Sequence, residues 1–483
     1  MRKKTKIVAT ISDKKCSIDL LRMMFEAGMD VVRLNTAHQT YDDALKVINM
    51  VRKVSNKIAL LLDTKGPEIR TTKSLEDIPV QCNDIVCIKG APKELTTREC
   101  ISVSYEEFVQ DVPVGSNILI DDGFIELIVI DKKDDHLVCE VQNDGVIQGR
   151  KSVNIPSVHV KLPTLSQKDI GFIHFAIENN LDFIAHSFVR HKDDVLAVKK
   201  ILDEHNSKIK IISKIENQEG VDNIDEILDH SYGIMIARGD LAVEIPQERI
   251  PSVQKMLISK ALDKRKPVIT ATQMLHSMIK SPRPTRAEVS DVANAIYDGT
   301  DAIMLSGETA YGDYPLKAVQ TMSNIALQVE KSLKPLRETP FFILNNRITA
   351  FLARSAVVAA FDLGAEVIIA DTITGRTIRG LAAYRGEKII FAQCYDEKVM
   401  RELALSYGVL PNYANMKSSN DEFINDAIQA LLNRKRIKNE DLIVILAGNF
   451  GPSSGASFIE VSSVENMRLK AEIALKRRDI TQA

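Results

Sequence analysis

The stretch DVVRLNTAHQT, residues 30–40, begins as an apolar run typical of a buried strand and then turns abruptly polar. Residues of one parity in a strand share a face, so Arg33 and Asn35 should point the same way where this strand ends. A cation and an amide that leave a hydrophobic strand together are costly to bury unless something binds them. The stretch therefore predicts a binding site at the carboxyl end of a buried strand.

The same design recurs along the first two-thirds of the chain, as short apolar segments that end in polar residues and precede helical patterns. The eight segments are KIVATI (6–11), DVVRLN (30–35), ALLLDT (59–64), FIAHSF (183–188), IKIISKIE (209–216), YGIMIAR (232–238), PVITATQ (267–273) and DAIMLSGE (301–308). Strands that alternate with helices form βαβ units and a parallel sheet. Eight such units predict an α/β fold, a (β/α)8 TIM barrel, whose active site lies at the carboxyl ends of its strands.

The spacing of these segments breaks once, between Asp63 and Phe183. The runs DIVCIKG, NILIDDGFIELIVID and HLVCEVQNDG are rich in strand-forming residues and are separated by Gly, Asp and Asn turns. We expect residues 71–159 to form a small all-β domain inserted into the barrel, which would comprise residues 1–70 and 160–341. Helical and strand patterns then restart, which predicts a C-terminal α/β domain over residues 342–483.

Bulk composition narrows the class of protein. The chain has 483 residues and a formal net charge of -2, so we expect two or three domains without bulk attraction to nucleic acid or membrane. No run approaches the roughly twenty apolar residues that a membrane helix needs. The six cysteines are scattered without zinc-type spacing. We expect a soluble, cytoplasmic protein with reduced thiols.

Two neighbouring strand ends carry the residues best suited to metal chemistry. ISKIENQEG (212–220) places Lys214 and Glu216 on one strand face, and IMIARGDLAVEIP (234–246) places Asp240 at the next strand end. Standing alone, the first pair could equally be a salt bridge. Two carboxylates with few other ligands suit Mg²⁺, which leaves room for substrate oxygens. Gly239 would permit close backbone approach, with helix amides available for an anion.

Several long motifs together resemble the pyruvate kinase family over essentially the whole chain. They are RLNTAH (33–38), LDTKGPEIR (62–70), SKIEN (213–217), ARGDLAVEIP (237–246), TATQML (270–275), RAEVSDVANA (286–295) and LSGETAYGDYP (305–315). The resemblance implies an enzyme that transfers the phosphoryl group of phosphoenolpyruvate to ADP, giving pyruvate and ATP in the last step of glycolysis. Its catalysis would be mainly positioning and charge neutralisation.

The resemblance also implies roles for individual residues. The catalytic residues would be Lys214, Arg33, Thr272 and Ser306. The substrate-binding residues would be Arg33, Lys214, Ala237, Arg238, Gly239, Asp240 and Thr272. The nucleotide-binding residues would be Asn35, His38, Arg70, Lys151 and Asp122. Because the last two lie in the inserted domain, that domain would act as a lid over the nucleotide.

Two kinds of cation follow from the same resemblance. Glu216 and Asp240 would hold Mg²⁺ or Mn²⁺, and Asn35, Asp63 and Thr64 would hold K⁺. Ala37 stands where the family has a serine ligand, whereas Glu68 is the residue of the K⁺-dependent branch. We therefore expect activation by K⁺ with weakened affinity.

Other positions also depart from the family pattern, namely Gln39, Ser152, Ala242, His186 and His276. We expect both histidines to be packed, with their hydrogen bonds satisfied. Every group that the chemistry requires is retained, which predicts an active enzyme.

The C-terminal domain carries a candidate effector loop. TITGRT (372–377) follows a strand and opens a helix, so its backbone amides could cradle a phosphate. By resemblance the loop would bind a sugar-phosphate effector through Thr372, Thr374, Gly375, Arg376 and Thr377; a plain helix cap is the alternative. GNFGPSSGASF (448–458) matches a second effector loop only loosely. The resemblance further implies a homotetramer.

Two other functions stay open at this stage. A Mg²⁺-dependent lyase or aldolase acting on oxo acids explains Lys214, Glu216 and Asp240, but not the lid or a second anion site. A metabolite-binding regulator that has lost turnover is supported by Ala37 and Ala242 alone. Dependence of pyruvate formation on ADP separates all three.

Overall fold

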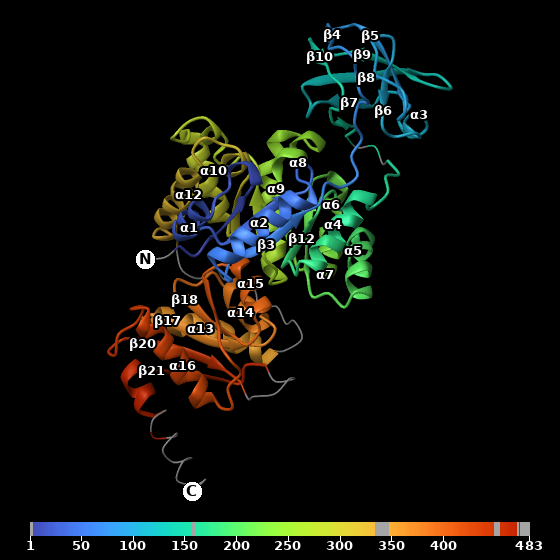
Figure 1. The fold of residues 1–483 in the computed structure, drawn as a ribbon. Coiled ribbons are helices and arrows are strands. Elements are labelled where there is room, and N and C mark those ends of the chain that lie inside the picture. The colour runs from blue at the N-terminus through green and yellow to red at the C-terminus, as the bar shows by residue number, and fades with distance from the viewer. Residues whose placement is uncertain are drawn as a thin grey trace.

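Eight parallel strands close into a barrel in the computed structural model, which describes residues 3–156, 158, 160–333, 347–448, 455–470 and 473 (Figure 1). The order around the barrel is β1 (Lys6–Thr10), β16 (Ala302–Leu305), β15 (Val268–Ala271), β14 (Gly233–Ala237), β13 (Lys210–Ile215), β12 (Phe183–His186), β3 (Ala59–Asp63) and β2 (Val31–Asn35). Each lies within one of the eight predicted segments. The predicted TIM barrel is confirmed.

Helices surround the barrel and cover its outer face. They are α1 (Ile18–Glu26), α2 (Tyr41–Val54), α4 (Gln167–Glu178), α5 (Lys192–Glu204), α6 (Gln218–Asp222), α7 (Ile224–His230), α8 (Arg238–Glu244), α9 (Ile250–Asp263), α10 (Arg286–Asp298), α11 (Gly307–Ala310) and α12 (Pro315–Glu330). Strand residues of one parity, such as Leu61 and Ile212, fill the interior. Those of the other parity, such as Ile184 and Ile234, pack against the helices. Because all eight strands are parallel, the polar residues that follow them lie at one end of the barrel.

A separate all-β domain is inserted between β3 and β12. Its strands are β4 (Ile78–Val80), β5 (Ile85–Gly90), β6 (Ile101–Val103), β7 (Asn117–Ile120), β8 (Ile125–Lys132), β9 (Leu137–Val141), β10 (Gly145–Ile147) and β11 (Val153–Asn154), with the short α3 (Phe108–Asp111). Six of them form one sheet, β11-β7-β8-β9-β5-β6, over a hydrophobic core of its own. The domain stands out from the barrel on two connecting segments (Figure 1). The boundaries at residues 71 and 159 stay predictions.

The C-terminal part of the chain is an α/β domain, as predicted. Its five-stranded sheet has the order β19 (Val409–Tyr413), β18 (Ile389–Cys394), β17 (Val367–Thr372), β20 (Leu442–Ala447) and β21 (Phe458–Ser463), with β21 antiparallel to β20. Its helices are α13 (Arg347–Asp362), α14 (Arg376–Ala383), α15 (Glu397–Glu402) and α16 (Asn420–Asn433). The predicted boundary at 341 and residues 449–454 of the second loop lie outside the described residues.

The C-terminal domain closes the amino-terminal end of the barrel. Ala404 and Leu405, in a short turn after α15, belong to the same buried cluster as the apolar residues inside the barrel. Arg401 just before them donates to Asp182 at 2.7 Å, between two buried side chains. In the part of the chain that the structure describes, no helix is both long and apolar enough to cross a membrane.

Candidate active site

A buried carboxylate at the end of β3 pairs with two positively charged side chains. The Asp63 Oδ2 atom lies 2.5 Å from Arg33 Nε of β2, and Asp63 Oδ1 lies 3.1 Å from Lys214 Nζ of β13. Arg33 also donates to the Thr10 hydroxyl of β1 at 2.9 Å. Burial raises the pKa of the Asp63 carboxyl, but the Arg33 and Lys214 charges outweigh it, so the pKa lies below its usual value. Asp63 therefore stays ionised and fixes both cations.

Lys214 lies at the centre of the polar cluster. Its Nζ atom is 2.9 Å from Glu216 Oε1 on the same strand and donates to the Ser187 hydroxyl at 2.7 Å. Burial lowers the pKa of this ammonium, but the Asp63 and Glu216 carboxylates raise it by a larger amount. The pKa of Lys214 therefore lies above its ordinary value. Lys214 is therefore a permanent positive charge at the end of β13.

Glu216 and Asp240 form a carboxylate pair of the kind that holds a divalent cation. Glu216 is buried and accepts the Phe188 N–H at 2.7 Å, whereas Asp240 is exposed in the first turn of α8. Burial raises the pKa of the Glu216 carboxyl; Lys214 opposes this shift, and the nearby Asp240 charge adds to it. The described residues contain no cluster of three metal-binding side chains. A site with two carboxylates fits Mg²⁺, which keeps positions for water and substrate.

The ends of β14 and β15 are locked together. Thr272 has φ 67°, which is unusual for a β-branched residue, and its hydroxyl accepts the Gly239 N–H at 2.7 Å. Arg238 donates to the Thr272 carbonyl at 2.8 Å and to the Asp291 carboxylate at 2.6 and 2.7 Å. The Arg238 side chain is thus engaged in holding these strand ends, leaving its backbone for any ligand. Ser306 follows β16 at the same end of the barrel.

The three predicted K⁺ ligands lie side by side. Asn35 and Asp63 are register partners on β2 and β3, and Thr64 follows directly. The Asn35 side-chain oxygen accepts the Ala37 N–H at 3.1 Å, and the Thr64 carbonyl accepts the Ser187 hydroxyl at 2.6 Å. Amide, carboxylate and carbonyl oxygens are the donors that hard cations take. The set fits a monovalent cation, with no hydroxyl from Ala37.

The predicted nucleotide-binding residues fall into two groups, one on the barrel and one at the lid. Lys151 of the lid pairs with Asp121 at 2.9 Å, and the Asp122 carboxylate accepts the Ser152 hydroxyl at 2.7 Å. Arg70 in the connecting segment donates to Glu68 at 2.8 Å and to the Arg150 carbonyl at 2.6 Å, and its backbone pairs with Ser152 of the lid. His38 is exposed beside β2. The structure therefore places Arg70, Lys151 and Asp122 together at the lid, whereas Asn35 and His38 lie on the barrel.

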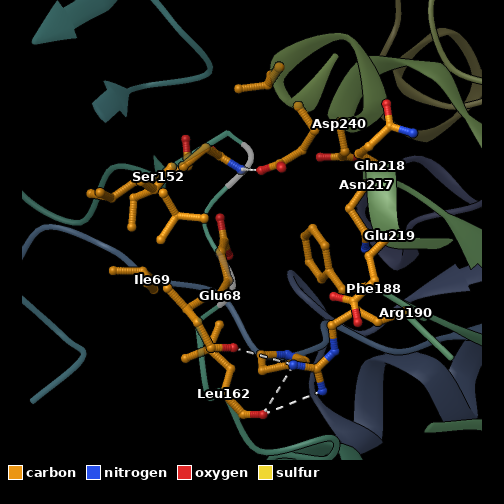
Figure 2. A pocket seen from close by; sticks show the side chains of 18 of the residues that line it. Glu68, Ile69, Ser152, Leu162, Phe188, Arg190, Asn217, Gln218, Glu219 and Asp240 are labelled. Carbon is orange, nitrogen blue, oxygen red and sulfur yellow. Dashed lines mark hydrogen bonds between the residues drawn. The ribbon is translucent and has the colours of Figure 1, made fainter. Parts of the chain in front are cut away.

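A cavity of about 440 Å³ separates the lid from the barrel. Figure 2 shows Ser152 on one wall, with Asp240 and Asn217 on the opposite wall. Asn154 of β11 donates to Glu244 of α8 at 3.0 Å, a direct contact between lid and barrel. The opening is thus lined by residues of both domains.

Both histidine expectations need correction. His186 is packed as predicted, but neither ring nitrogen has a hydrogen-bond partner among the described residues. Burial lowers the pKa of His186 to about 4, which keeps the ring neutral. His276 is exposed and not packed, because it begins a turn at the surface. Sequence reasoning also missed Thr10, Ser187 and Asp291, whose partners come from distant strands and helices.

The predicted effector loop forms a tight turn before α14. Gly375 has φ 76°, which glycine tolerates, and its N–H donates to the Thr372 hydroxyl at 2.8 Å. Arg376 and Thr377 begin the helix and line a cavity of about 810 Å³ between this domain and the barrel. Lys264, Lys266 and Arg379 also line it, so its wall is rich in positive charge.

The fold and this site define a barrel enzyme with a lid, in which a fixed lysine and arginine face a carboxylate pair suited to Mg²⁺. The family descriptions "Pyruvate kinase, barrel domain" and "Pyruvate kinase, alpha/beta domain" match residues 2–319 and 351–462. The chain belongs to the pyruvate kinase family. It is an enzyme, a phosphotransferase that makes pyruvate and ATP from phosphoenolpyruvate and ADP.

The relatives match nearly the whole of this chain. The chain is 46% identical to the pyruvate kinase of Borreliella burgdorferi, with 99% of each chain covered, and 45% identical to that of Bacillus licheniformis, with 97% of this chain and 82% of the other covered. The crystal structure of a pyruvate kinase from Cryptosporidium parvum superposes with a TM-score of 0.89 at 37% identity, covering 96% of each chain.

Proposed function

We propose that the cluster around Asp63 carries the phosphoryl transfer in this enzyme. The observation that supports this most is the double pairing of Asp63, which fixes Arg33 and Lys214 as preorganised cations beside Glu216. Phosphoryl transfer between two polyanions needs positioning and charge neutralisation rather than a covalent intermediate. Arg33 binds the phosphoryl group, and Lys214 stabilises the phosphoryl group in transfer and the enolate oxygen.

Glu216 and Asp240 are the proposed ligands of Mg²⁺ or Mn²⁺. Held there, the ion would supply positive charge that neutralises the substrate's oxygens. The backbone of Ala237, Arg238 and Gly239 binds the substrate carboxylate together with the Thr272 hydroxyl. Because Gly239 N–H already donates to Thr272, the substrate enters an existing hydrogen-bonded pair. The strained backbone at Thr272 supports this role, since strain of about 1–3 kcal/mol concentrates at functional sites.

Thr272 and Ser306 are the proposed residues on the side of the enolate that receives the proton, with water as the carrier. Asn35, His38 and Arg70 bind the nucleotide from the barrel side. Lys151 and Asp122 bind it from the lid, which closes over it and excludes water. Lys151 of the lid is paired with Asp121, and we propose that this pair separates when the nucleotide binds.

Asn35, Asp63 and Thr64 are the proposed K⁺ ligands, with affinity weakened by Ala37. Formation of pyruvate from phosphoenolpyruvate, with and without ADP, Mg²⁺ and K⁺, tests the proposal. We expect no turnover without ADP or Mg²⁺, and partial turnover without K⁺. Pyruvate formed without ADP would favour a lyase, and phosphoenolpyruvate binding without turnover would favour a regulator. Full activity with no monovalent cation would sink the K⁺ assignment.

We further propose a sugar-phosphate effector at Thr372, Thr374, Gly375, Arg376 and Thr377, supported by the positively charged cavity beside α14. We also propose, from membership of the family, that the enzyme is a homotetramer and works in the cytoplasm. Titrating a panel of sugar phosphates at low phosphoenolpyruvate, for the native enzyme and Arg376→Ala, tests the effector site. Activation that Arg376→Ala abolishes supports it, and activation unchanged in the variant contradicts it. Sedimentation velocity of the full chain tests the tetramer.

A further inference from the structure

Ser187 is a buried hydroxyl at the meeting point of three barrel strands. It directly follows β12, and 1% of its surface is exposed. Its Oγ atom accepts a hydrogen bond from Lys214 Nζ of β13 at 2.7 Å and donates to the Thr64 carbonyl after β3 at 2.6 Å. The same Oγ atom lies 3.4 Å from Asp63 Oδ1. One hydroxyl therefore joins the central lysine to the Thr64 carbonyl, with the Asp63 carboxylate close by.

The backbone around Ser187 strengthens this arrangement. The Ser187 N–H donates to the Thr64 hydroxyl at 3.1 Å, and the Phe188 N–H donates to Glu216 at 2.7 Å. Thr64 N–H in turn donates to the Ala185 carbonyl at 3.0 Å. The backbone of residues 185–188 is thus tied to Thr64 and Glu216, which fixes the position of Ser187 between them.

The direction of each hydrogen bond follows from the donors present. An ammonium has only donors, so Lys214 donates and Ser187 Oγ accepts. The single hydroxyl proton then goes to the Thr64 carbonyl, which has two lone pairs. This contact uses one lone pair and orients the second. The Ser187 hydroxyl therefore orients the Thr64 carbonyl, one of the proposed K⁺ ligands, in a site where Ala37 contributes no hydroxyl of its own.

We propose that Ser187 is a positioning residue that couples the monovalent-cation site to Lys214. Its hydroxyl holds the ammonium toward the reacting phosphoryl group and holds the Thr64 carbonyl toward the cation. The same hydrogen bonds therefore support both turnover and cation binding. The inference rests on the proposed function for the role of Lys214, whereas its cation-binding half can be measured without turnover.

Ser187→Ala removes the bridge and leaves the neighbouring fold intact. Loss of a buried hydrogen bond to a charged group corresponds to about a tenfold to hundredfold effect, which we expect in kcat at saturating K⁺. The KM for phosphoenolpyruvate should stay within about twofold, because the phosphoryl contact of Arg33 is untouched. The K⁺ concentration for half-activation should rise at least about fivefold. Ser187→Thr, which restores the hydroxyl, should recover part of both effects.

Ser213→Ala is the matched control. Ser213 is also buried, precedes Lys214 directly, and shares its hydrogen bond with Ser231 at 2.5 Å, away from the site. Its substitution should change neither kcat nor the K⁺ concentration for half-activation by more than about twofold. Any general weakening of β13 would appear in this variant as well, so a difference between the two variants reports the bridge itself.

Equilibrium cation binding gives a readout without turnover. The melting temperature of the free full-length enzyme is followed as K⁺ is titrated against tetramethylammonium. Ser187→Ala should shift the half-saturating K⁺ concentration by the same factor as in the activity titration. A variant with unchanged kcat, or with reduced kcat and an unchanged K⁺ titration, would overturn the coupling. A native enzyme that bound K⁺ without ADP-dependent turnover would refute the proposed function instead.

Discussion

Replacing Lys214 by methionine tests the centre of the proposed mechanism. The substitution keeps an unbranched apolar side chain out to the ε position and removes the ammonium group, with its charge and its hydrogen-bond donors. At an effective dielectric constant near 20, the contacts of Nζ with Glu216 at 2.9 Å and Asp63 at 3.1 Å are each worth about 5–6 kcal/mol before desolvation. Desolvation of the ammonium offsets several kcal/mol of this sum. A large net attraction remains, consistent with the raised pKa of Lys214.

Turnover and metal binding should respond in opposite directions. Loss of a preorganised charge at the reacting group lowers kcat by at least about 100-fold, since one such contact contributes roughly 2.7–4 kcal/mol in the transition state. Glu216, freed from its internal cation, should bind a divalent metal at least as tightly as before. Pyruvate formation at saturating substrates measures the first effect, and Mn²⁺ titration followed by electron paramagnetic resonance measures the second.

Lys210→Met provides the control on the same strand. Lys210 lies at the opposite end of β13, where its nearest carboxylate is Glu402 at 3.7 Å. Its substitution should leave kcat within about threefold. If Lys214→Met retained kcat within tenfold of the native enzyme, the role proposed for this lysine would be wrong.

Three further predictions concern the cation site, the domain junction and the strand ends. Ala37→Ser should lower the K⁺ concentration for half-activation at least about fivefold by supplying a hydroxyl ligand; an unchanged titration would contradict the proposed site. Burial raises the pKa of Glu402 from 4.5 to about 7, so its stabilising effect is present below pH 4.5 and is lost as pH rises through 7. Glu402→Gln should therefore reduce, by on the order of 2 kcal/mol, the loss of stability between about pH 5 and pH 8 in thermal denaturation, and parallel pH curves would refute this. Arg238→Met breaks the ion pair with Asp291 and should raise the KM for phosphoenolpyruvate about tenfold in steady-state kinetics. An unchanged KM would contradict this prediction.

The sequence predicts the barrel and its central cluster well because both depend on local patterns. Apolar strands with polar ends are visible in single segments, and parallel strands necessarily bring those ends together. The local pattern places Arg33, Lys214 and Glu216 at strand ends, whereas the resemblance predicts Asp63 only as a K⁺ ligand, and neither predicts its pairing with both Arg33 and Lys214. The pairing of the Arg238 side chain with Asp291 was not predictable, because Asp291 lies on α10, which is distant in the sequence.

Ser187 and His186 show a second limit of sequence reasoning. Serine and histidine after a buried strand have several equally ordinary environments, and only packing chooses among them. The hydroxyl of Ser187 meets two other strands, whereas the ring of His186 meets no hydrogen-bond partner among the described residues. The placement of the lid residues likewise depends on the angle between domains, which no local pattern encodes.

The closure of the barrel's amino-terminal end by Ala404 and Leu405 has a consequence for synthesis of the chain. The last barrel strand ends at Leu305, one hundred residues before Leu405. Translation proceeds from the amino terminus, so all eight strands leave the ribosome before the residues that cover their apolar lower end. The growing barrel must wait with that end open until the C-terminal domain has emerged as far as Leu405. Premature termination ahead of residue 404 would leave the barrel permanently uncovered, an exposed surface that chaperones and proteases recognise.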